Sequence, residues 1–171
     1  STHRGTLFPY TTLFRSKGTP LLCDYMQTFR ERSRRDVKLV FTGSGTIDAP
    51  PALRPHLFDA GFVSETEKHE AMAGAIAFLH PSVNESFGIV LLEAFLARTP
   101  GLVHARSRVL VSQCRASGAG LWFRHYPDFE NQLLWLLDHP EARAALGSRG
   151  HDYVAREYAW PVIERKFMEA L

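Results

Sequence analysis

Short, continuous apolar segments alternate with longer helical segments along this chain. The segments that we predict to be strands are residues 37–42, 75–79, 101–105 and 121–123. The predicted helices are residues 21–32, 65–73, 87–97, 108–117, 128–137, 140–155 and 161–171. Buried strands that alternate with helices are typical of a mostly parallel sheet covered on both faces. The sequence therefore predicts an α/β domain with three layers, α/β/α, and 171 residues with 45% apolar side chains suit a single domain.

Capping and breaking residues set the expected helix ends. Ser64, with Glu67 three positions later, predicts a capping box at the start of the helix over residues 65–73. Asp128 is expected to be the N-cap of the next long helix. Gly147 and Gly150 are expected to interrupt the helix over residues 140–155.

Composition disfavours several functional classes. The net charge is only +2 with neutral histidines, which is too small to indicate nucleic-acid binding. The arginines of residues 30–35 are mixed with acidic residues, so we interpret them as a solvated helix end rather than a membrane-binding surface. Cys23 and Cys114 have no metal-ligand spacing, which is typical of a reduced, cytoplasmic protein. No segment approaches 18 consecutive apolar residues, so none is expected to span a membrane.

Two glutamates, Glu85 and Glu93, stand eight positions apart at the start of the helix predicted over residues 87–97. At about 100° per residue, eight steps leave them roughly 80° apart around the axis, with Glu93 about two turns into the helix. Both are therefore expected to line one flank of the cleft above the strand ends, where open α/β sheets bind ligands. The unpaired N–H groups of the helix start between them suit phosphate.

This arrangement fits a ligand with phosphates in its middle and polyols at both ends. Carboxylates repel a diphosphate, but they are strong acceptors for the hydroxyl groups of vicinal diols. A nucleotide-sugar carries a ribose on one side of its diphosphate and a sugar on the other. The alternative is a helix with one glutamate at its start and the other on a solvated face, and the pair by itself leaves both interpretations open.

The sequence around Glu85 and Glu93 resembles the donor-binding domain of retaining glycosyltransferases with the GT-B fold, in particular glycosyltransferase family 4. The motif is Pro81-Ser82, Glu85-Ser86-Phe87-Gly88 and Glu93-Ala94. The segments at residues 38–45, 61–63, 118–121, 144–147 and 158–160 follow the order of the family. The resemblance covers about residues 17–171, and it implies a Rossmann-like domain that forms one half of a GT-B enzyme.

The resemblance also implies roles for individual residues. Glu85 is expected to contact the hydroxyls of the transferred sugar, and Glu93 those of the ribose. The residues expected at the diphosphate are Lys17, Ser86, Phe87, Gly88 and Ile89. Gly43 is expected to form a turn near the donor cleft, and Phe62 and Val63 to flank the base; a plain tight turn and a core-packing turn are the respective alternatives. Gly88 is expected to let the ligand approach closely.

Other polar residues carry weaker expectations. The chain contains no Asp-x-Asp sequence, so we expect no metal, and no cofactor apart from the nucleotide-sugar donor. Neither glutamate is expected to act as a nucleophile. His80 stands just before the motif, and we interpret it as a packed or solvated histidine rather than a ligand-binding one.

The first 16 residues do not resemble the family. Residues 6–16 read like the translation of a common DNA-sequencing adapter, so we interpret residues 1–16 as an artefact and residues 17–171 as the native domain. The family implies an arginine six positions before Lys17-Gly18, where this chain has Thr11. We therefore expect one of two diphosphate cations to be missing, and Arg106 or Arg108 to replace it in part.

The leading functional hypothesis is the donor-binding half of a hexosyl-type glycosyltransferase. It would act on a nucleotide-diphosphate sugar, would lack the N-terminal acceptor-binding domain, and would be inactive alone. The alternatives are a GT-B-fold sugar-nucleotide epimerase and a non-catalytic nucleotide-sugar-binding domain. Peripheral membrane association is a possibility for the full-length enzyme only.

Overall fold

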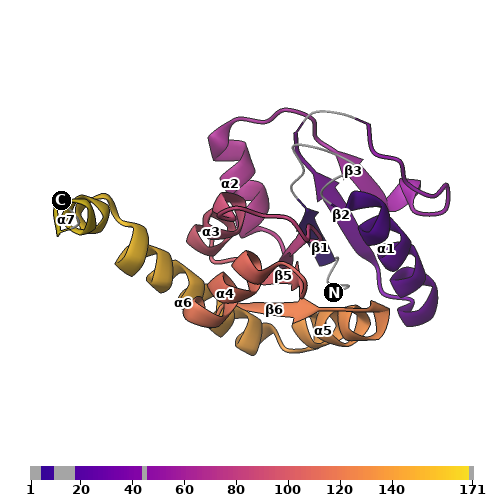
Figure 1. Ribbon diagram of the computed structural model, residues 1–171. Coiled ribbons are helices and arrows are strands. Elements are labelled where there is room, and N and C mark those ends of the chain that lie inside the picture. Colours follow the sequence, from indigo (N-terminus) through magenta and orange to yellow (C-terminus); the bar gives the residue numbers. More distant parts are fainter. Residues whose placement is uncertain (1–4, 10–17, 44–45, 170–171) are drawn as a thin grey trace.

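One parallel sheet organises the computed structural model, which describes residues 5–9, 18–43 and 46–169 (Figure 1). Its strand order is β3-β2-β1-β4-β5-β6. The strands are β1 (Gly5–Pro9), β2 (Val37–Phe41), β3 (Leu57–Asp59), β4 (Ala77–His80), β5 (Gly101–His104) and β6 (Gly120–Phe123). All pairs of neighbouring strands are parallel. The direction of strand order reverses between β1 and β4, and ligands of such sheets bind outside the carboxyl ends of the strands at that point.

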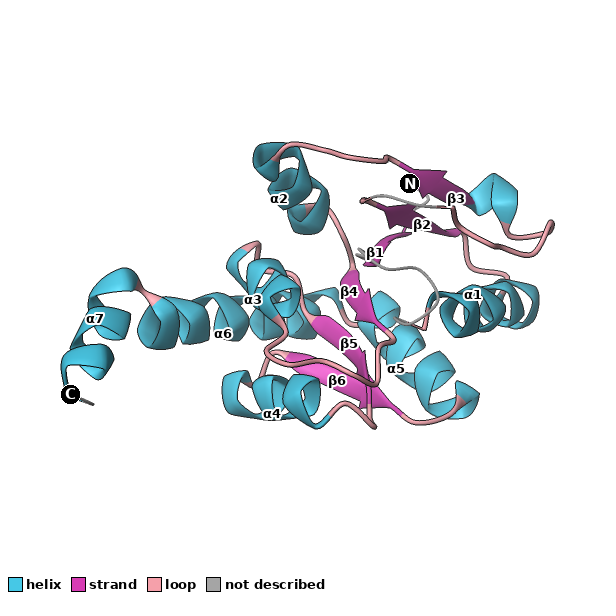
Figure 2. Ribbon diagram, turned by 45° about the horizontal axis from the view of Figure 1, so that its top comes forward, coloured by secondary structure: helices cyan, strands magenta, loops and turns pink. Residues whose placement is uncertain are grey.

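Helices cover both faces of the sheet, as the sequence predicts (Figure 2). They are α1 (Thr19–Ser33), α2 (Glu65–Ala73), α3 (Ile89–Leu96), α4 (Arg108–Ser117), α5 (Tyr126–Asp138), α6 (Pro140–Tyr158) and α7 (Trp160–Glu169), and a short 3₁₀ turn spans Arg54–His56. Helices α1 and α5 belong to one buried cluster, and α2, α3 and α4 belong to the other. The three-layer α/β/α architecture is therefore confirmed.

Alternate residues of each buried strand face the two helical layers. In β4, Ala77 and Leu79 pack in the cluster with α1 and α5, whereas Phe78 packs in the cluster with α3. All four residues of β4 are buried, so the strand needs apolar side chains on both faces. This two-sided burial explains why the strands read as continuous apolar segments rather than as alternating patterns.

Strand β1 was not among the strands that we expected. Residues 5–9 lie inside the segment that the sequence analysis sets aside, yet the structure places them between β2 and β4. The register pairs Leu7 with Leu39 on one side and with Ala77 on the other. The adapter origin of residues 1–16 stays a prediction, because strand pairing does not test it.

Two helix boundaries differ from the expectations. Asp128 is not the N-cap of α5, which begins at Tyr126; its carboxylate accepts hydrogen bonds from the backbone N–H groups of Arg124 and His125. Helix α6 is continuous from Pro140 to Tyr158, with no interruption at Gly147 or Gly150. These glycines instead allow α6 to approach its neighbours closely, because a Cβ atom at Gly147 would lie 2.0 Å from the carbonyl oxygen of Arg98.

The capping box at the start of α2 is confirmed. The backbone N–H of Glu67 donates to Ser64 Oγ at 3.2 Å, and the N–H of Ser64 donates to Glu67 Oε2 at 2.8 Å. The Glu67 carboxylate also accepts a hydrogen bond from Ser64 Oγ at 2.7 Å. The bonds that it accepts from the backbone N–H and the hydroxyl of Ser64 lower its pKa, because they stabilise the charged form. The box fixes the direction in which α2 leaves the preceding turn.

Helix α7 projects away from the sheet at the C-terminal end of α6 (Figure 1). Its side chains Trp160, Phe167 and Met168 are exposed. In the part of the chain that the structure describes, no helix is long and apolar enough to cross a membrane.

Candidate functional site

A cavity of about 620 Å³ lies at the carboxyl ends of β4 and β5, beside the reversal of strand order. Its lining comes from the loop after β4 and from the loop and first turn that follow β5. The lining residues are Val83, Asn84, Glu85, Ser86, Arg106, Arg108 and Val109. A carboxylate and two guanidinium groups thus share one open cavity, which can accept hydroxyl groups and anionic oxygens together.

Glu85 is held inside this loop by a contact with the preceding strand. Its Oε1 lies 3.4 Å from Nε2 of His80, and only 11% of the Glu85 side chain and 6% of the His80 side chain are exposed. Ser82 Oγ donates to the carbonyl oxygen of Asn84 at 3.0 Å, which fixes the loop between them. The packed state expected of His80 is confirmed, but its contact with Glu85 was not foreseen.

Glu85 lies in the loop before α3, as expected, but Glu93 lies nearer the start of this helix than expected. Helix α3 begins at Ile89, so Glu93 is about one turn into it instead of two. The expected 80° separation applied helical rotation to every residue from Glu85 to Glu93, and the residues before Ile89 are not helical. Glu93 is partly exposed at 31% of its side chain, and it does not line the cavity that contains Glu85.

Glu93 instead pairs with a residue that sequence reasoning missed. Nζ of Lys68, on α2, lies 3.1 Å from Glu93 Oε2 and 2.7 Å from Glu65 Oε2. The Lys68 side chain is only 11% exposed. A signal was available, because Lys68 stands four residues before the buried Met72 and so occupies the inward face of α2.

The structure gives Gly88 two roles besides the expected one. It has φ 80°, in the left-handed region that glycine adopts without strain, and it caps α3. A Cβ atom here would lie 2.8 Å from Cδ2 of Leu110, on α4. The missing side chain therefore serves the turn and the packing of α3 on α4, and not only the approach of a ligand.

Three further residues that we expected to lie near the nucleotide-sugar, Gly43, Phe62 and Val63, lie in the turns after β2 and β3. The N–H of Gly43 donates to the carbonyl oxygen of Gly61 at 2.7 Å, which joins the two turns. Phe62 is 83% exposed, and Val63 is partly buried. An aromatic ring this exposed has a free face, but neither residue lines the cavity of Glu85. Phe87 and Ile89 are also exposed, at 45% and 60%.

Arg106 and Arg108 both reach the cavity of Glu85 from the start of α4. His104 holds the intervening loop, because its Nδ1 accepts a hydrogen bond from the N–H of Arg106 at 3.2 Å. Burial lowers the pKa of His104, and the charges of Arg106 and His125 lower it further. The imidazole is thus favoured in the neutral form, which can accept this bond.

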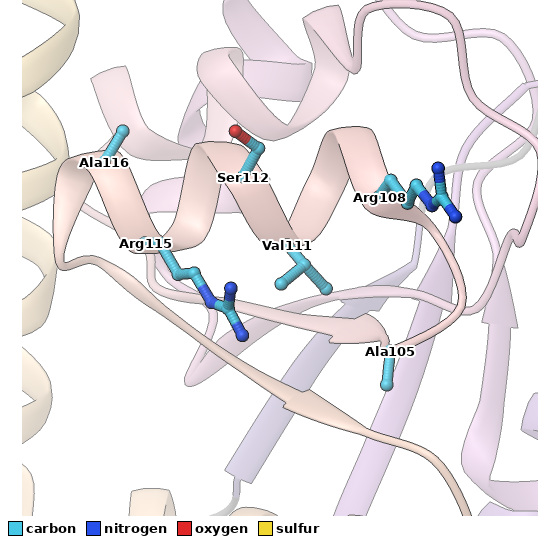
Figure 3. Close-up of a pocket in the computed structure, with 6 residues that line it drawn as sticks. All are labelled: Ala105, Arg108, Val111, Ser112, Arg115 and Ala116. Carbon is cyan, nitrogen blue, oxygen red and sulfur yellow. The ribbon is translucent and has the colours of Figure 1, made fainter.

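A second cavity, of about 610 Å³, runs along α4 (Figure 3). Arg108 and Arg115 extend from opposite ends of the helix, and Val111 lies between them. The guanidinium of Arg115 stacks over the ring of Trp122 at 5.2 Å from its centroid. Arg108 lines both cavities, so it is the residue that connects them.

Lys17 and Thr11 lie outside the described residues, so their expected roles cannot be placed in this site. Within residues 5–9, 18–43 and 46–169, no group of three or more His, Cys, Asp and Glu side chains is arranged to hold a metal ion.

Comparisons with known proteins agree on the family and the fold. The family model described as glycosyl transferases group 1 matches residues 4–153. No curated protein matches the chain.

Solved structures share the fold at low sequence identity. TarM has a TM-score of 0.83 at 15% identity, over 97% of this chain and 34% of that chain. Anabaena Alr3699/HepE in complex with UDP-glucose has a TM-score of 0.79 at 15% identity, over 98% and 48%. The C-terminal domain of LpcC from Francisella tularensis, a glycosyl transferase group 1 family protein, has a TM-score of 0.72 at 15% identity, over 91% and 87%. The chain thus spans about a third to a half of the first two proteins and most of the third.

Proposed function

Because the chain belongs to the glycosyl transferases group 1 family, we propose that it is the donor-binding half of a retaining glycosyltransferase. Its substrate would be a nucleotide-diphosphate sugar, from which a hexosyl group passes to an acceptor. The observation that carries the proposal is the cavity in which Glu85, Ser86, Arg106 and Arg108 meet at the carboxyl ends of β4 and β5. The likeness to a structure in complex with UDP-glucose supports the choice of donor class.

The acidic and the basic lining residues of this cavity suit different parts of the donor. The Glu85 carboxylate is an acceptor for sugar hydroxyls, whereas a diphosphate needs donors and positive charge. Arg106 and Arg108 supply both, and their guanidinium groups can bind phosphate oxygens in a bidentate manner. Helix α3, which is capped by Gly88 two residues after Ser86 of the cavity, would add the unpaired backbone N–H groups of its first turn.

The same groups would serve the transfer reaction. The bond between the anomeric carbon and the diphosphate oxygen breaks, and negative charge develops on the departing diphosphate. Fixed cations and backbone amides at that position stabilise the charge more in the transition state than in the ground state. Arg106, Arg108, the start of α3 and Lys17 would provide this stabilisation, and Glu85 would hold the sugar in place.

The acceptor would bind to a further domain. The chain spans 48% of the length of HepE and 87% of the isolated C-terminal domain of LpcC, which supports the assignment to one half of a two-domain enzyme. The residues of this chain by themselves are expected to bind donor and to transfer little.

Binding measurements by calorimetry on the purified chain test this function. We expect UDP-glucose, or another nucleotide-sugar in a panel, to bind more tightly than its free nucleoside diphosphate. Glu85→Gln should weaken the binding of the nucleotide-sugar about tenfold or more, because it removes one charge-assisted hydrogen bond. It should leave the affinity for the nucleoside diphosphate unchanged.

The matched control is Glu70→Gln, which removes an exposed carboxylate from α2 outside the cavity. It should change neither affinity. A chain that binds no nucleotide-sugar, or a Glu85→Gln variant that binds like wild type, would exclude the proposed site.

A further inference from the structure

Lys68 is a nearly buried cation between two helices of the candidate site. Only 11% of its side chain is exposed, whereas lysine side chains usually keep the ammonium group in water. Its Nζ contacts Glu65 one turn earlier on α2, at 2.7 Å, and Glu93 on α3, at 3.1 Å. Burial alone would lower the pKa of Lys68, but its bonds to Glu65 and Glu93 raise it, so the amine stays charged.

The two carboxylates that share Lys68 differ in their surroundings. The Glu65 side chain is 85% exposed, so its ion pair is solvated and contributes little. The Glu93 side chain is 31% exposed and emerges from the first turns of α3. Lys68 contacts Oε2 of this carboxylate.

Lys68 also connects two parts of the site that are distant in sequence. Helix α2 begins directly after the turn that carries Phe62 and Val63, and the capping box of Ser64 and Glu67 fixes that junction. The ion pair between Lys68 and Glu93 then ties α2 to α3. A movement of the turn relative to Glu93 would break this pair.

We propose that Lys68 is a positioning residue that presents Glu93 to the ribose diol of the donor. This inference rests on the proposed function and on the role that the family resemblance implies for Glu93, acceptance of hydrogen bonds from the ribose hydroxyls. Lys68 holds one carboxylate oxygen so that the other points at the diol. Its charge also offsets that of Glu93, which would otherwise repel the neighbouring diphosphate.

Ribose discrimination tests the proposal. Calorimetry would measure the affinities of the purified chain for UDP, ADP and GDP, and then for the 2′,3′-dideoxy form of the one that binds tightest. The ratio of the two affinities reports the contribution of the diol. Because both ligands are measured on the same variant, partial unfolding cancels from the ratio.

Variants of the pair give distinct outcomes. Glu93→Gln and Lys68→Met should each reduce the ratio, Lys68→Met by about fivefold, the size expected for coupling between residues in contact. Lys68→Arg should restore most of the ratio, because it retains the charge. Glu65→Gln is the matched control, since it removes the other partner of the same lysine and should leave the ratio unchanged.

Each contrary result has a separate meaning. A reduced ratio in Glu93→Gln with a wild-type ratio in Lys68→Met would reject the role of Lys68 and keep the role of Glu93 in binding the donor. A wild-type ratio in Glu93→Gln would reject the contact between Glu93 and ribose, and with it this inference, while the Glu85→Gln test still judges the sugar site. No binding of any nucleoside diphosphate by wild type would reject the inference and the proposed function together.

Discussion

Replacing Gly147 by alanine should destabilise the domain, although the residue lies inside a helix. Gly147 belongs to α6, where that helix packs against the end of α3. A Cβ atom added there would lie 2.0 Å from the carbonyl oxygen of Arg98 and 2.8 Å from its carbonyl carbon. Both atoms belong to the backbone, so no rotation of a side chain can relieve the overlap.

Two opposing terms set the size of the effect. Alanine is favoured over glycine in a helix interior by about 1 kcal/mol, which would stabilise the variant. Since Cβ atoms essentially never lie under 3.0 Å from another heavy atom, α6 must instead move about 1 Å away from α3. Overpacking of this kind costs about 1–3 kcal/mol, and a backbone obstruction belongs at the upper end. The expected net change is a loss of about 2 kcal/mol, or roughly 4–8 °C in Tm for a domain of this size.

Urea denaturation followed by far-UV circular dichroism would measure the free energy of unfolding. The control is Gly74→Ala, at the end of α2, where the nearest atom to an added Cβ is the Glu70 carbonyl oxygen at an ordinary 3.5 Å. That variant should stay within about 0.5 kcal/mol of wild type. A Gly147→Ala variant as stable as wild type, or more stable, would refute the close approach of α6 to α3.

Three further predictions concern single residues. Arg98 has φ 59°, so Arg98→Gly should relieve about 1–2 kcal/mol of strain from the left-handed backbone conformation. The greater entropy of the unfolded variant offsets part of this gain, and the net effect should be a higher Tm. A lower Tm would contradict the presence of strain at Arg98. Ser64→Ala should cost about 1 kcal/mol at neutral pH by removing the cap of α2. The Ser64 backbone N–H, which the variant keeps, is the larger cause of the lowered Glu67 pKa, and the Ser64 hydroxyl is the smaller one. The part due to the hydroxyl is present above the ordinary glutamate pKa and lost as pH falls through the lowered value, so the difference from wild type in urea midpoint should shrink slightly in acid. Burial lowers the pKa of His104, so its protonation in the unfolded state should reduce stability as pH falls below the ordinary histidine value of 6.5. His104→Gln should therefore flatten the dependence of the urea midpoint on pH. An NMR titration of the imidazole in the folded chain should give the lowered pKa directly.

The fold was predictable because strands that are buried on both faces of a sheet carry apolar residues at nearly every position. Strands β4 and β5 are buried at every position, and the structure places them where the sequence does to within two residues. The helix ends were harder. Asp128 carries a capping side chain, but it acts from inside α5 rather than before it. Gly147 reads as a helix breaker because the sequence does not reveal a neighbouring backbone that only glycine can approach.

The site was predictable in its residues and less so in its geometry. Glu85, Ser86, Arg106 and Arg108 meet in one cavity, as their positions after two neighbouring strands suggest. The expected angle between Glu85 and Glu93 was wrong because it counted helical rotation from Glu85, whereas α3 begins only after its N-cap, Gly88. The spacing of Lys68 to Met72 indicates the inward face of α2. The pairing of Lys68 with Glu93 was still missed, because a contact between two helices leaves no local pattern in the sequence.

Strand β1 shows why fold and chemistry must be judged separately in this protein. A central strand needs backbone pairing, which many sequences can supply, and residues 5–9 supply it despite their predicted foreign origin. Binding of a diphosphate needs a particular cation at a particular place. At the position where the family implies an arginine, the sequence has Thr11. A foreign segment could therefore complete the sheet and still remove a phosphate contact, so the affinity for the donor is the property that decides whether this domain still works.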